Sequence, residues 1–289
     1  MRDDFAVFIL THGRADKVVT FNKVLKAGNY TGKWYMVIDN EDDQANEYIS
    51  RYGKDHVIVF DKQAVDDRTD TADTLHEHRA IIYARNESFN IAKNLGLKYF
   101  LMLDDDYTGL AHRFETEGKM RMKSCTQLDR LFEDMIQFLD ASNALTVAFC
   151  QGGDFVGGVK GKRFHEKVVR KAMNSFFCCV DRPFQFVGTM NEDVTMYTTL
   201  GSRGNLIMSI TDVAINQLQT QSVKGGMSEA YADGGTYLKA FYSVMSMPSC
   251  IRVEMLNSHH KRIHHKIDWT CCVPKILNER YRKKVSYIE

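Results

Sequence analysis

The strongest constraint on the fold is an apolar run, Tyr99–Leu103, that ends in three consecutive aspartates, Asp104, Asp105 and Asp106. Such a run indicates a buried strand. Placing three adjacent carboxylates at its end costs free energy, because they repel one another and lose water. A bound cation offsets that cost, and carboxylate oxygens suit hard divalent ions such as Mg²⁺ and Mn²⁺. The alternative is a solvated acidic turn after the strand.

The N-terminal half alternates short apolar runs with polar segments of helical period. The runs predict strands at 5–10, 34–38 and 57–60, and a helical stripe within 77–95 leads into the strand that ends at Asp104. This alternation predicts βαβ units, and therefore an α/β fold with a mixed, mainly parallel sheet flanked by helices. Ligands of such sheets bind beyond the carboxyl ends of the strands, where the aspartates lie.

The size and composition of the chain favour one domain over residues 1–289. Of the 289 residues 44% are hydrophobic, which is enough for a large core, and no stretch rich in Pro, Gly or Ser indicates a linker. The seven cysteines fit reduced thiols better than a disulfide framework. No signal-peptide pattern or run of about 20 apolar residues occurs, so we expect a soluble, cytoplasmic protein with no membrane partner.

The second half is less regular. It predicts a helix at 129–139, strands at 146–150 and 175–180, and a second helix that Asn191 caps and that runs to about Gly201. The Gly-rich segment 152–161 predicts a hairpin or a mobile loop, and residues 217–236 predict a loop that orders over a ligand.

Two further clusters stand out by composition. Residues 160–171 carry six cations against one glutamate, which is typical either of a surface that binds polyanions or of a solvated charged face. Four histidines lie between His259 and His265. Such a cluster is typical either of a site that contacts phosphate or metal or of an ordinary protein surface.

In combination, these motifs resemble those of the GT-A glycosyltransferases, whose metal signature is Asp-x-Asp at a strand end. The order is Thr11–Arg14, Asp39, Arg85, the triple Asp, the pair Glu192-Asp193 and the late histidines. More narrowly, the chain resembles the TET-associated glycosyltransferases of tailed bacteriophages, which are thought to glycosylate oxidised 5-methylpyrimidines in phage DNA. The resemblance includes Gly234–Tyr237 and Arg262–Ile267.

The resemblance implies a role for each motif in binding the donor. Residues 1–110 would bind the nucleotide sugar, and residues 111–289, with the His-rich segment, would bind the acceptor. Thr11, Arg14 and Asp39 would line the base and ribose of a UDP-sugar. The remaining donor contacts would come from Arg85, Asp104 and Asp105. Asp106 is the preferred ligand of a Mn²⁺ or Mg²⁺ ion, with Asp104 beside it, and the ion would stabilise the departing diphosphate.

The same resemblance suggests the groups that serve the acceptor. Its hydroxyl needs a general base, for which Asp193, or failing that Glu192, is the candidate, although acidic residues in a first helical turn also simply complement the helix dipole. His264 or His265 would complete the metal shell. An acceptor base of 5-hydroxymethylcytosine type in DNA would have to leave the stack. The DNA phosphates would contact Lys160, Lys162, Arg163, Lys167, Arg170 and Lys171.

Three alternatives remain open. The acceptor could be a protein or a glycan, with unchanged chemistry. The chain could be a sugar nucleotidyltransferase, although the Gly-rich N-terminal loop of those enzymes is missing. It could also be a non-catalytic relative that binds nucleic acid, although such proteins typically lose the carboxylates that are present here. The residue types select neither the sugar, nor the stereochemical course, nor the oligomeric state.

Overall fold

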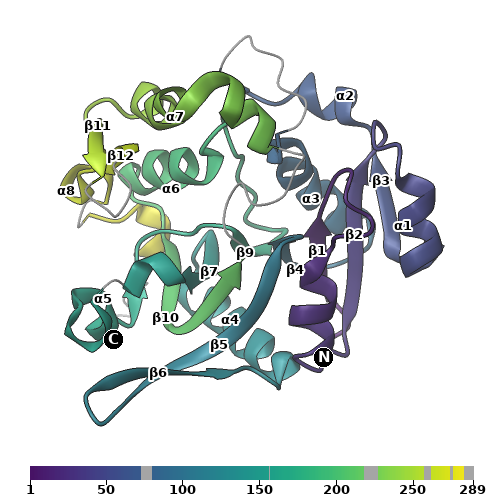
Figure 1. Ribbon diagram of the computed structural model, residues 1–289, viewed down its shortest axis with the longest axis horizontal. Helices are drawn as coiled ribbons and strands as arrows, with labels where there is room; N and C mark the ends of the chain where they lie inside the picture. Colours follow the sequence, from purple (N-terminus) through teal and green to yellow (C-terminus); the bar gives the residue numbers. More distant parts are fainter. Residues whose placement is uncertain (73–79, 156, 218–226, 257–261, 274–275, 283–289) are drawn as a thin grey trace, which may run out of the picture.

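The computed structural model describes residues 1–72, 80–155, 157–217, 227–256, 262–273 and 276–282. Its centre is one large mixed sheet with helices on both faces, and a separate two-stranded sheet, β11–β12, lies to one side (Figure 1). This α/β architecture confirms the predicted fold class and is consistent with the GT-A type. The sheet runs in the order β3-β2-β1-β4-β9-β7-β10-β5-β6, and β8 pairs with β10.

The strands of both halves of the chain belong to this sheet. Their bounds are β1 Phe5–Leu10, β2 Lys33–Asp39, β3 Val57–Phe60, β4 Tyr99–Asp104, β5 Tyr107–Thr116, β6 Lys119–Ser124, β7 Thr146–Gln151, β8 Val168–Val169, β9 Ser175–Cys179 and β10 Ile207–Gln217, with β11 Ile251–Leu256 and β12 Arg262–Ile267 outside it.

The N-terminal part of the sheet is parallel, as the βαβ pattern predicts. Strand β1 pairs in parallel with both β2 and β4, and β2 with β3. Antiparallel pairing starts where β4 meets β9, so the sheet as a whole is mixed. The carboxyl ends of β1, β2 and β4 therefore meet at one edge, with Leu10 opposite Asp104.

The helices cover both faces of the sheet. Their bounds are α1 Ala45–Tyr52, α2 Lys62–Asp66, α3 Ile82–Asn94, α4 Leu128–Ser142, α5 Lys162–His165, α6 Glu192–Ser202, α7 Met227–Ser246 and α8 Trp269–Cys272, with a π-helix at Phe21–Lys26 and 3₁₀ turns at Lys54–His56, Gly152–Phe155, Gly158–Lys160 and Glu279–Tyr281.

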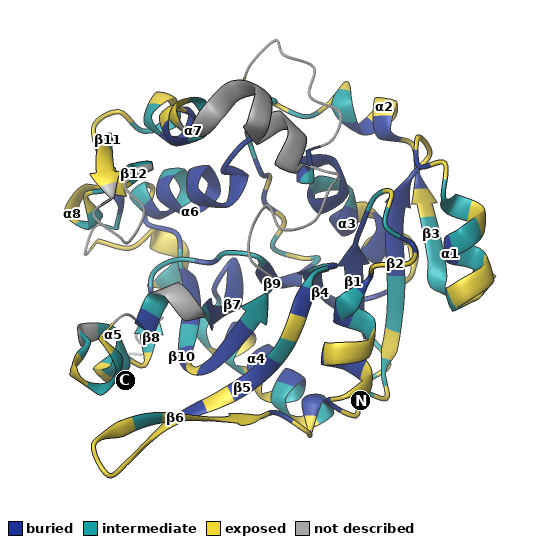
Figure 2. Ribbon diagram, viewed as in Figure 1, coloured by how far each residue is buried: buried dark blue, intermediate teal, exposed yellow. Residues whose placement is uncertain are grey.

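Strand β1 contributes side chains to the hydrophobic cores on both faces of the sheet. All six of its residues are buried (Figure 2). Successive side chains of a strand point to opposite faces of the sheet. Phe8 packs with Phe100 and with α3 and α6 on one face, whereas Phe5 packs with Phe132 of α4 on the other. A strand buried on both faces needs a continuous apolar run, which is why 5–10 and 99–103 are visible in the sequence.

Three sequence predictions need correction. A loop is predicted at 217–236, but residues 227–236 belong to α7. Good helix formers such as Ala230 offset the cost of about 1 kcal/mol for each glycine in this helix. Residues 218–226 lie outside the described residues. Asn191 does precede α6, but its side chain caps nothing. It has φ 51° and donates to Lys239 O at 2.5 Å and to Ser243 Oγ at 3.2 Å. In the Gly-rich segment, the described residues form 3₁₀ turns and no hairpin, and the alternative of a mobile loop stays a prediction.

The predicted helix at 77–95 is observed from Ile82, and residues 73–79 lie outside the described residues. Within the described part of the chain, no helix combines the length and apolar character needed to cross a bilayer.

Candidate active site at the end of strand β4

The turn after β4 is held by the segment before the π-helix. Thr20 Oγ1 donates to Asp104 O at 2.6 Å and accepts from Tyr107 N at 2.9 Å. The amides of Val19 and Thr20 both donate to Asp105 O, at 2.8 and 3.1 Å. These bonds fix the backbone of the three aspartates, so their side chains diverge into three different environments.

Asp104 and Asp105 are each held by an arginine and a hydroxyl group. Asp104 lies 3.2 Å from Arg85 Nη2 and accepts from Tyr107 Oη at 3.1 Å. Asp105 is buried; it accepts from Thr11 Oγ1 at 2.7 Å and from Arg14 Nη1 at 3.1 Å. Burial raises the pKa of both carboxyl groups, and the arginines oppose that shift.

Asp106 differs from its neighbours because no cationic side chain of the described residues forms an ion pair with it. Its pKa is raised to about 7, first by burial and then by the charges of Asp104 and Asp105, although Arg14 opposes the rise. A partly buried carboxylate beside two other carboxylates and without an ion-pair partner is the group that a cation would stabilise most.

Arg85 of α3 links the aspartates to α6. It is 2% exposed, and its guanidinium also contacts the Glu192 carboxylate and lies 5.0 Å from the Phe176 ring centroid. Burial raises the pKa of Glu192, while Arg85 opposes the shift. Asp193, also buried in the first turn of α6, accepts from Val194 N at 2.7 Å. The structure thus brings the predicted residues Arg85, Asp104 and Glu192 into contact.

A second charged group lies at the ends of β1 and β2. Asp39 Oδ2 lies 2.8 Å from His12 Nδ1, and Asp39 Oδ1 lies 3.0 Å from Lys62 Nζ. Burial opposes ionisation of Asp39, but its bonds to His12 and Lys62 prevail and lower its pKa. The bond to Asp39 raises the pKa of His12.

Sequence reasoning missed several of these residues. Nothing in the local pattern marks Tyr48, Tyr107 or Lys62, which is 3% exposed at the start of α2. His12 lies within the predicted motif Thr11–Arg14, but no role is predicted for it. Tyr48 Oη contacts Thr11 Oγ1 at 2.9 Å and accepts from Arg14 N at 2.9 Å, so it positions two predicted donor-binding residues. Apart from the bond between Tyr107 and Asp104, these contacts join positions far apart in the chain, and only the fold brings them together.

The residues at the strand end fit a cation that the substrate helps to bind. Among the described residues, no three His, Cys, Asp or Glu side chains already converge on one point. Mg²⁺ is commonly held by one or two carboxylates plus substrate phosphates, a donor set that Asp106 and Asp104 match. His264 and His265 lie on β12, which packs against α7. Burial lowers the pKa of His265 to about 4. Their role as metal ligands stays a prediction, and His259 and His260 lie outside the described residues.

In the basic segment 160–171, most of the described cations already have acceptors. Arg163 pairs with Glu166 at 2.7 Å, Lys167 with Asp212 at 2.9 Å, and Lys171 with Asp154. Arg170 donates to Asn205 O at 3.0 Å. Lys160 is exposed, and the side chain of Lys162 lies outside the described residues. That this segment binds DNA stays a prediction. Fewer of its cations are without an acceptor than the sequence indicates.

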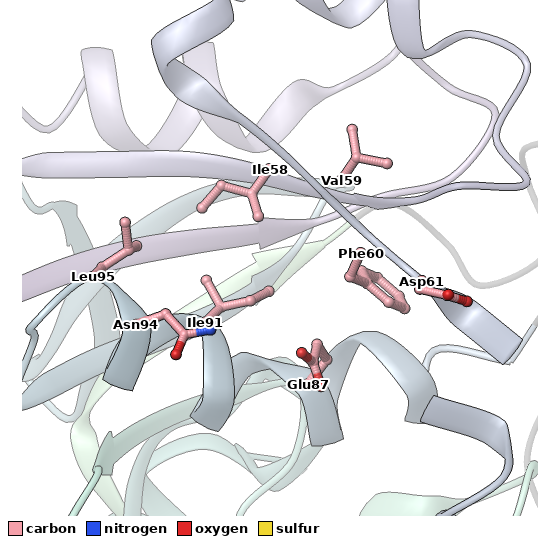
Figure 3. Close-up of a pocket in the computed structure, with 8 residues that line it drawn as sticks. All are labelled: Ile58, Val59, Phe60, Asp61, Glu87, Ile91, Asn94 and Leu95. Carbon is pink, nitrogen blue, oxygen red and sulfur yellow. The ribbon is translucent and has the colours of Figure 1, made fainter. Parts of the chain in front are cut away.

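A hollow of about 250 Å³ lies elsewhere, between edge strand β3 and helix α3 (Figure 3). Apolar side chains such as Ile58, Phe60 and Ile91 line it, with Asp61 and Glu87 at its rim. None of the predicted site residues lines this hollow, so it is distinct from the strand-end site.

The comparisons with known proteins agree with this geometry. No curated protein matches the chain. The family model described as TET-Associated Glycosyltransferase matches residues 5–226, a range that contains the strand-end aspartates, Arg85 and the start of α6. Since that range covers most of the 289 residues, the chain belongs to the TET-associated glycosyltransferase family.

Proposed function

We propose that this glycosyltransferase moves a sugar from a UDP-sugar to the hydroxyl of a modified pyrimidine, such as 5-hydroxymethylcytosine in phage DNA, with the help of Mn²⁺ or Mg²⁺. The observation that carries the metal dependence is Asp106. Its neighbours Asp104 and Asp105 are each bound by an arginine, whereas Asp106 has no ion-pair partner among the described residues and a pKa of about 7.

The donor half of the reaction would use the edge where β1, β2 and β4 end. Arg14 and Thr11 are fixed by Asp105 and Tyr48, so they are pre-organised to contact a nucleotide. His12 is partly exposed and held by Asp39, which suits a hydrogen bond to the base or ribose. A divalent cation at Asp106 would supply Lewis-acid stabilisation of the diphosphate leaving group.

The acceptor half would use the first turn of α6. Glu192 is bound by Arg85 and so acts in this proposal as the counterion of that arginine. Asp193 is the general base that would take the proton of the acceptor hydroxyl, since its carboxylate accepts from Val194 N and forms no ion pair with any described residue. Both carboxylates raise the pKa of Arg85, which also binds Asp104 of the aspartate cluster.

The experiment follows UDP release with Mn²⁺ from UDP-glucose, UDP-N-acetylglucosamine, UDP-galactose and UDP-glucuronate. Each donor is tested with and without a duplex that contains 5-hydroxymethylcytosine, for the wild type and for Asp106→Asn. The unmodified cytosine duplex is the matched control for the acceptor.

Release that requires both the modified duplex and Asp106 supports the proposal and names the sugar. Release that requires Asp106 but is unchanged by the duplex rejects DNA as the acceptor and favours a protein or glycan. Release that survives Asp106→Asn in full overturns the metal site.

A further inference from the structure

In the β5–β6 hairpin, five of the six residues of β6 are exposed. The hairpin extends beyond the body of the molecule, and β6 lies at the edge of the sheet (Figures 1 and 2). Glu117 and Gly118 form its two-residue turn with φ of 53° and 70°, the left-handed pair typical of a tight hairpin. Thr116 and Lys119 are the last paired residues before that turn.

One face of this hairpin carries cations and an aromatic ring without a carboxylate. The pairs His112–Lys123, Phe114–Arg121 and Thr116–Lys119 lie opposite one another, so their six side chains share a face. All six are exposed, and Phe114 is 42% exposed. Glu115 alternates to the other face, where Arg113 is buried.

The cations on this face are available, in contrast to those of segment 160–171. Lys119, Arg121 and Lys123 form no ion pair with any described residue. They recur at every second position of one strand, so they lie about 6.8 Å apart. The phosphates of one strand of B-DNA rise by about 3.4 Å along the helix axis and also wind around it, so their separation is of the same order as the spacing of these cations.

We propose that the His112, Phe114, Lys119, Arg121 and Lys123 face of the β5–β6 hairpin is a binding surface for the sugar-phosphate backbone of the DNA acceptor. The inference rests on the proposed DNA acceptor and names a surface that serves it. A two-stranded ribbon has the width of the B-DNA major groove, and an exposed aromatic ring stacks on bases or sugars.

The position of the hairpin relative to the site supports this assignment. Strand β5 starts at Tyr107, immediately after Asp106, and reaches its last residue, Thr116, about 30 Å further along the strand. That length is close to one helical turn of a duplex, about 34 Å. A polymer with one nucleotide at the aspartates can therefore lie along the ribbon, whereas a short glycan acceptor cannot use it.

An edge strand rich in lysine has a competing explanation, because charged residues also prevent edge-to-edge pairing of sheets. The two explanations differ in what charge reversal does. If the cations only protect the edge, their loss changes association of the protein with itself and leaves its affinity for DNA unchanged.

The test is fluorescence anisotropy with a 30-base-pair duplex that carries one central 5-hydroxymethylcytosine, measured across a salt series. The triple variant Lys119→Glu/Arg121→Glu/Lys123→Glu is expected to bind about 30-fold or more weakly at low salt. The slope of log affinity against log salt is expected to decrease by about 2.7, since each phosphate contact contributes about 0.9. Phe114→Ala is expected to weaken binding while the slope stays unchanged.

The matched control is Lys54→Glu/Lys93→Glu/Arg203→Glu, which reverses the same number of exposed charges at positions outside the hairpin and outside the π-helix that packs on β5. UDP affinity in Mn²⁺ and thermal unfolding verify that each variant is folded and binds the donor.

If the wild type binds the duplex and the hairpin triple loses no more affinity than the control triple, the hairpin surface is overturned while the DNA acceptor stands. If the wild type binds neither modified nor unmodified duplex at low salt, the DNA acceptor of the proposed function fails and the hairpin surface fails with it. A hairpin triple that changes only its oligomeric state supports edge protection and also overturns the proposal.

Discussion

The acidic cluster 104–106 and the basic segment 160–171 look alike in the sequence, as runs of one charge, but the fold treats them in opposite ways. In the acidic cluster, arginines bind two of the three carboxylates and none of the described cations pairs with the third, Asp106. In the basic segment, Arg163, Lys167 and Lys171 all pair with carboxylates. The number of charged residues in a segment therefore does not predict how many of them can bind a ligand. That number depends on which of them form ion pairs in the folded protein.

The largest expected effect comes from Asp106→Asn. We expect metal-dependent UDP release to fall about 1,000-fold, because the preferred cation ligand is lost. At pH 8 without metal the same variant should be more stable than the wild type by roughly 1–2 kcal/mol, a value discounted because solvent reaches part of the side chain. Steady-state kinetics and thermal unfolding measure the two quantities.

The matched variant is Asp105→Asn, which removes the same charge one residue earlier. Because it deprives Arg14 and Thr11 of their acceptor, we expect it to destabilise the fold by about 1–3 kcal/mol. If both variants shift stability in the same direction, the contrast between the two carboxylates is wrong.

Next in size is Arg85→Met, which leaves Glu192 and Asp104 buried without their common cation. We expect a loss of about 3–5 kcal/mol of unfolding free energy, since breaking a buried pair leaves an uncompensated charge. The double variant Arg85→Met/Glu192→Met should recover part of the stability but none of the activity. Chemical denaturation measures the unfolding free energy of both variants. If the double variant is destabilised as much as Arg85→Met alone, the broken pair of Arg85 and Glu192 is not the cause of the lost stability.

A smaller effect is the pH dependence of Mn²⁺ affinity. The pKa of Asp106 is about 7, so below that pH the carboxyl group holds a proton. The affinity for Mn²⁺ should therefore fall about tenfold for each unit by which the pH drops below 7, and it should be constant at higher pH. Calorimetry with Mn²⁺ and UDP measures the affinity, and Asp106→Asn should remove the dependence.

The same group gives a stability prediction with a definite sign. Between pH 3.8 and about 7 the folded state holds a proton on Asp106 that the unfolded state has released. The contribution of this group to the unfolding free energy of the metal-free protein therefore falls as pH rises through that window, and Asp106→Asn removes that contribution. A contribution that instead rises with pH would mean that a cationic group stabilises the carboxylate.

The smallest expected effect is in the basic segment. Since Lys167 is paired with Asp212 at the surface, Lys160→Ala/Lys167→Ala should change DNA affinity by less than about threefold. The anisotropy assay used for the hairpin measures it. A loss as large as that of the hairpin triple would restore the basic segment as the main DNA contact.

The sequence by itself determined the parallel half of the sheet and the position of the aspartates at a strand end. Strands buried on both faces, such as 5–10 and 99–104, need unbroken apolar runs, and the aspartates mark where β4 ends. The helices α3, α4 and α6 also follow from local pattern. The β5–β6 hairpin was missed although Glu117-Gly118 and the alternation in β6 are local signals, and 227–236 was misassigned because two glycines outweighed the helix formers around them.

Tertiary structure alone decided which charges are neutralised. The ionisable partners of Asp105, Asp39 and Arg85 lie from 19 to 107 positions away in the chain, and no local pattern predicts the contacts of Lys62 and Tyr48. Periodicity reports which face of an element is buried, since that depends on neighbours within a few residues. The pairing of charges depends instead on how helices and strands meet at the strand ends. Only the assembled fold therefore shows that, of the three aspartates, Asp106 alone lacks an arginine partner among the described residues.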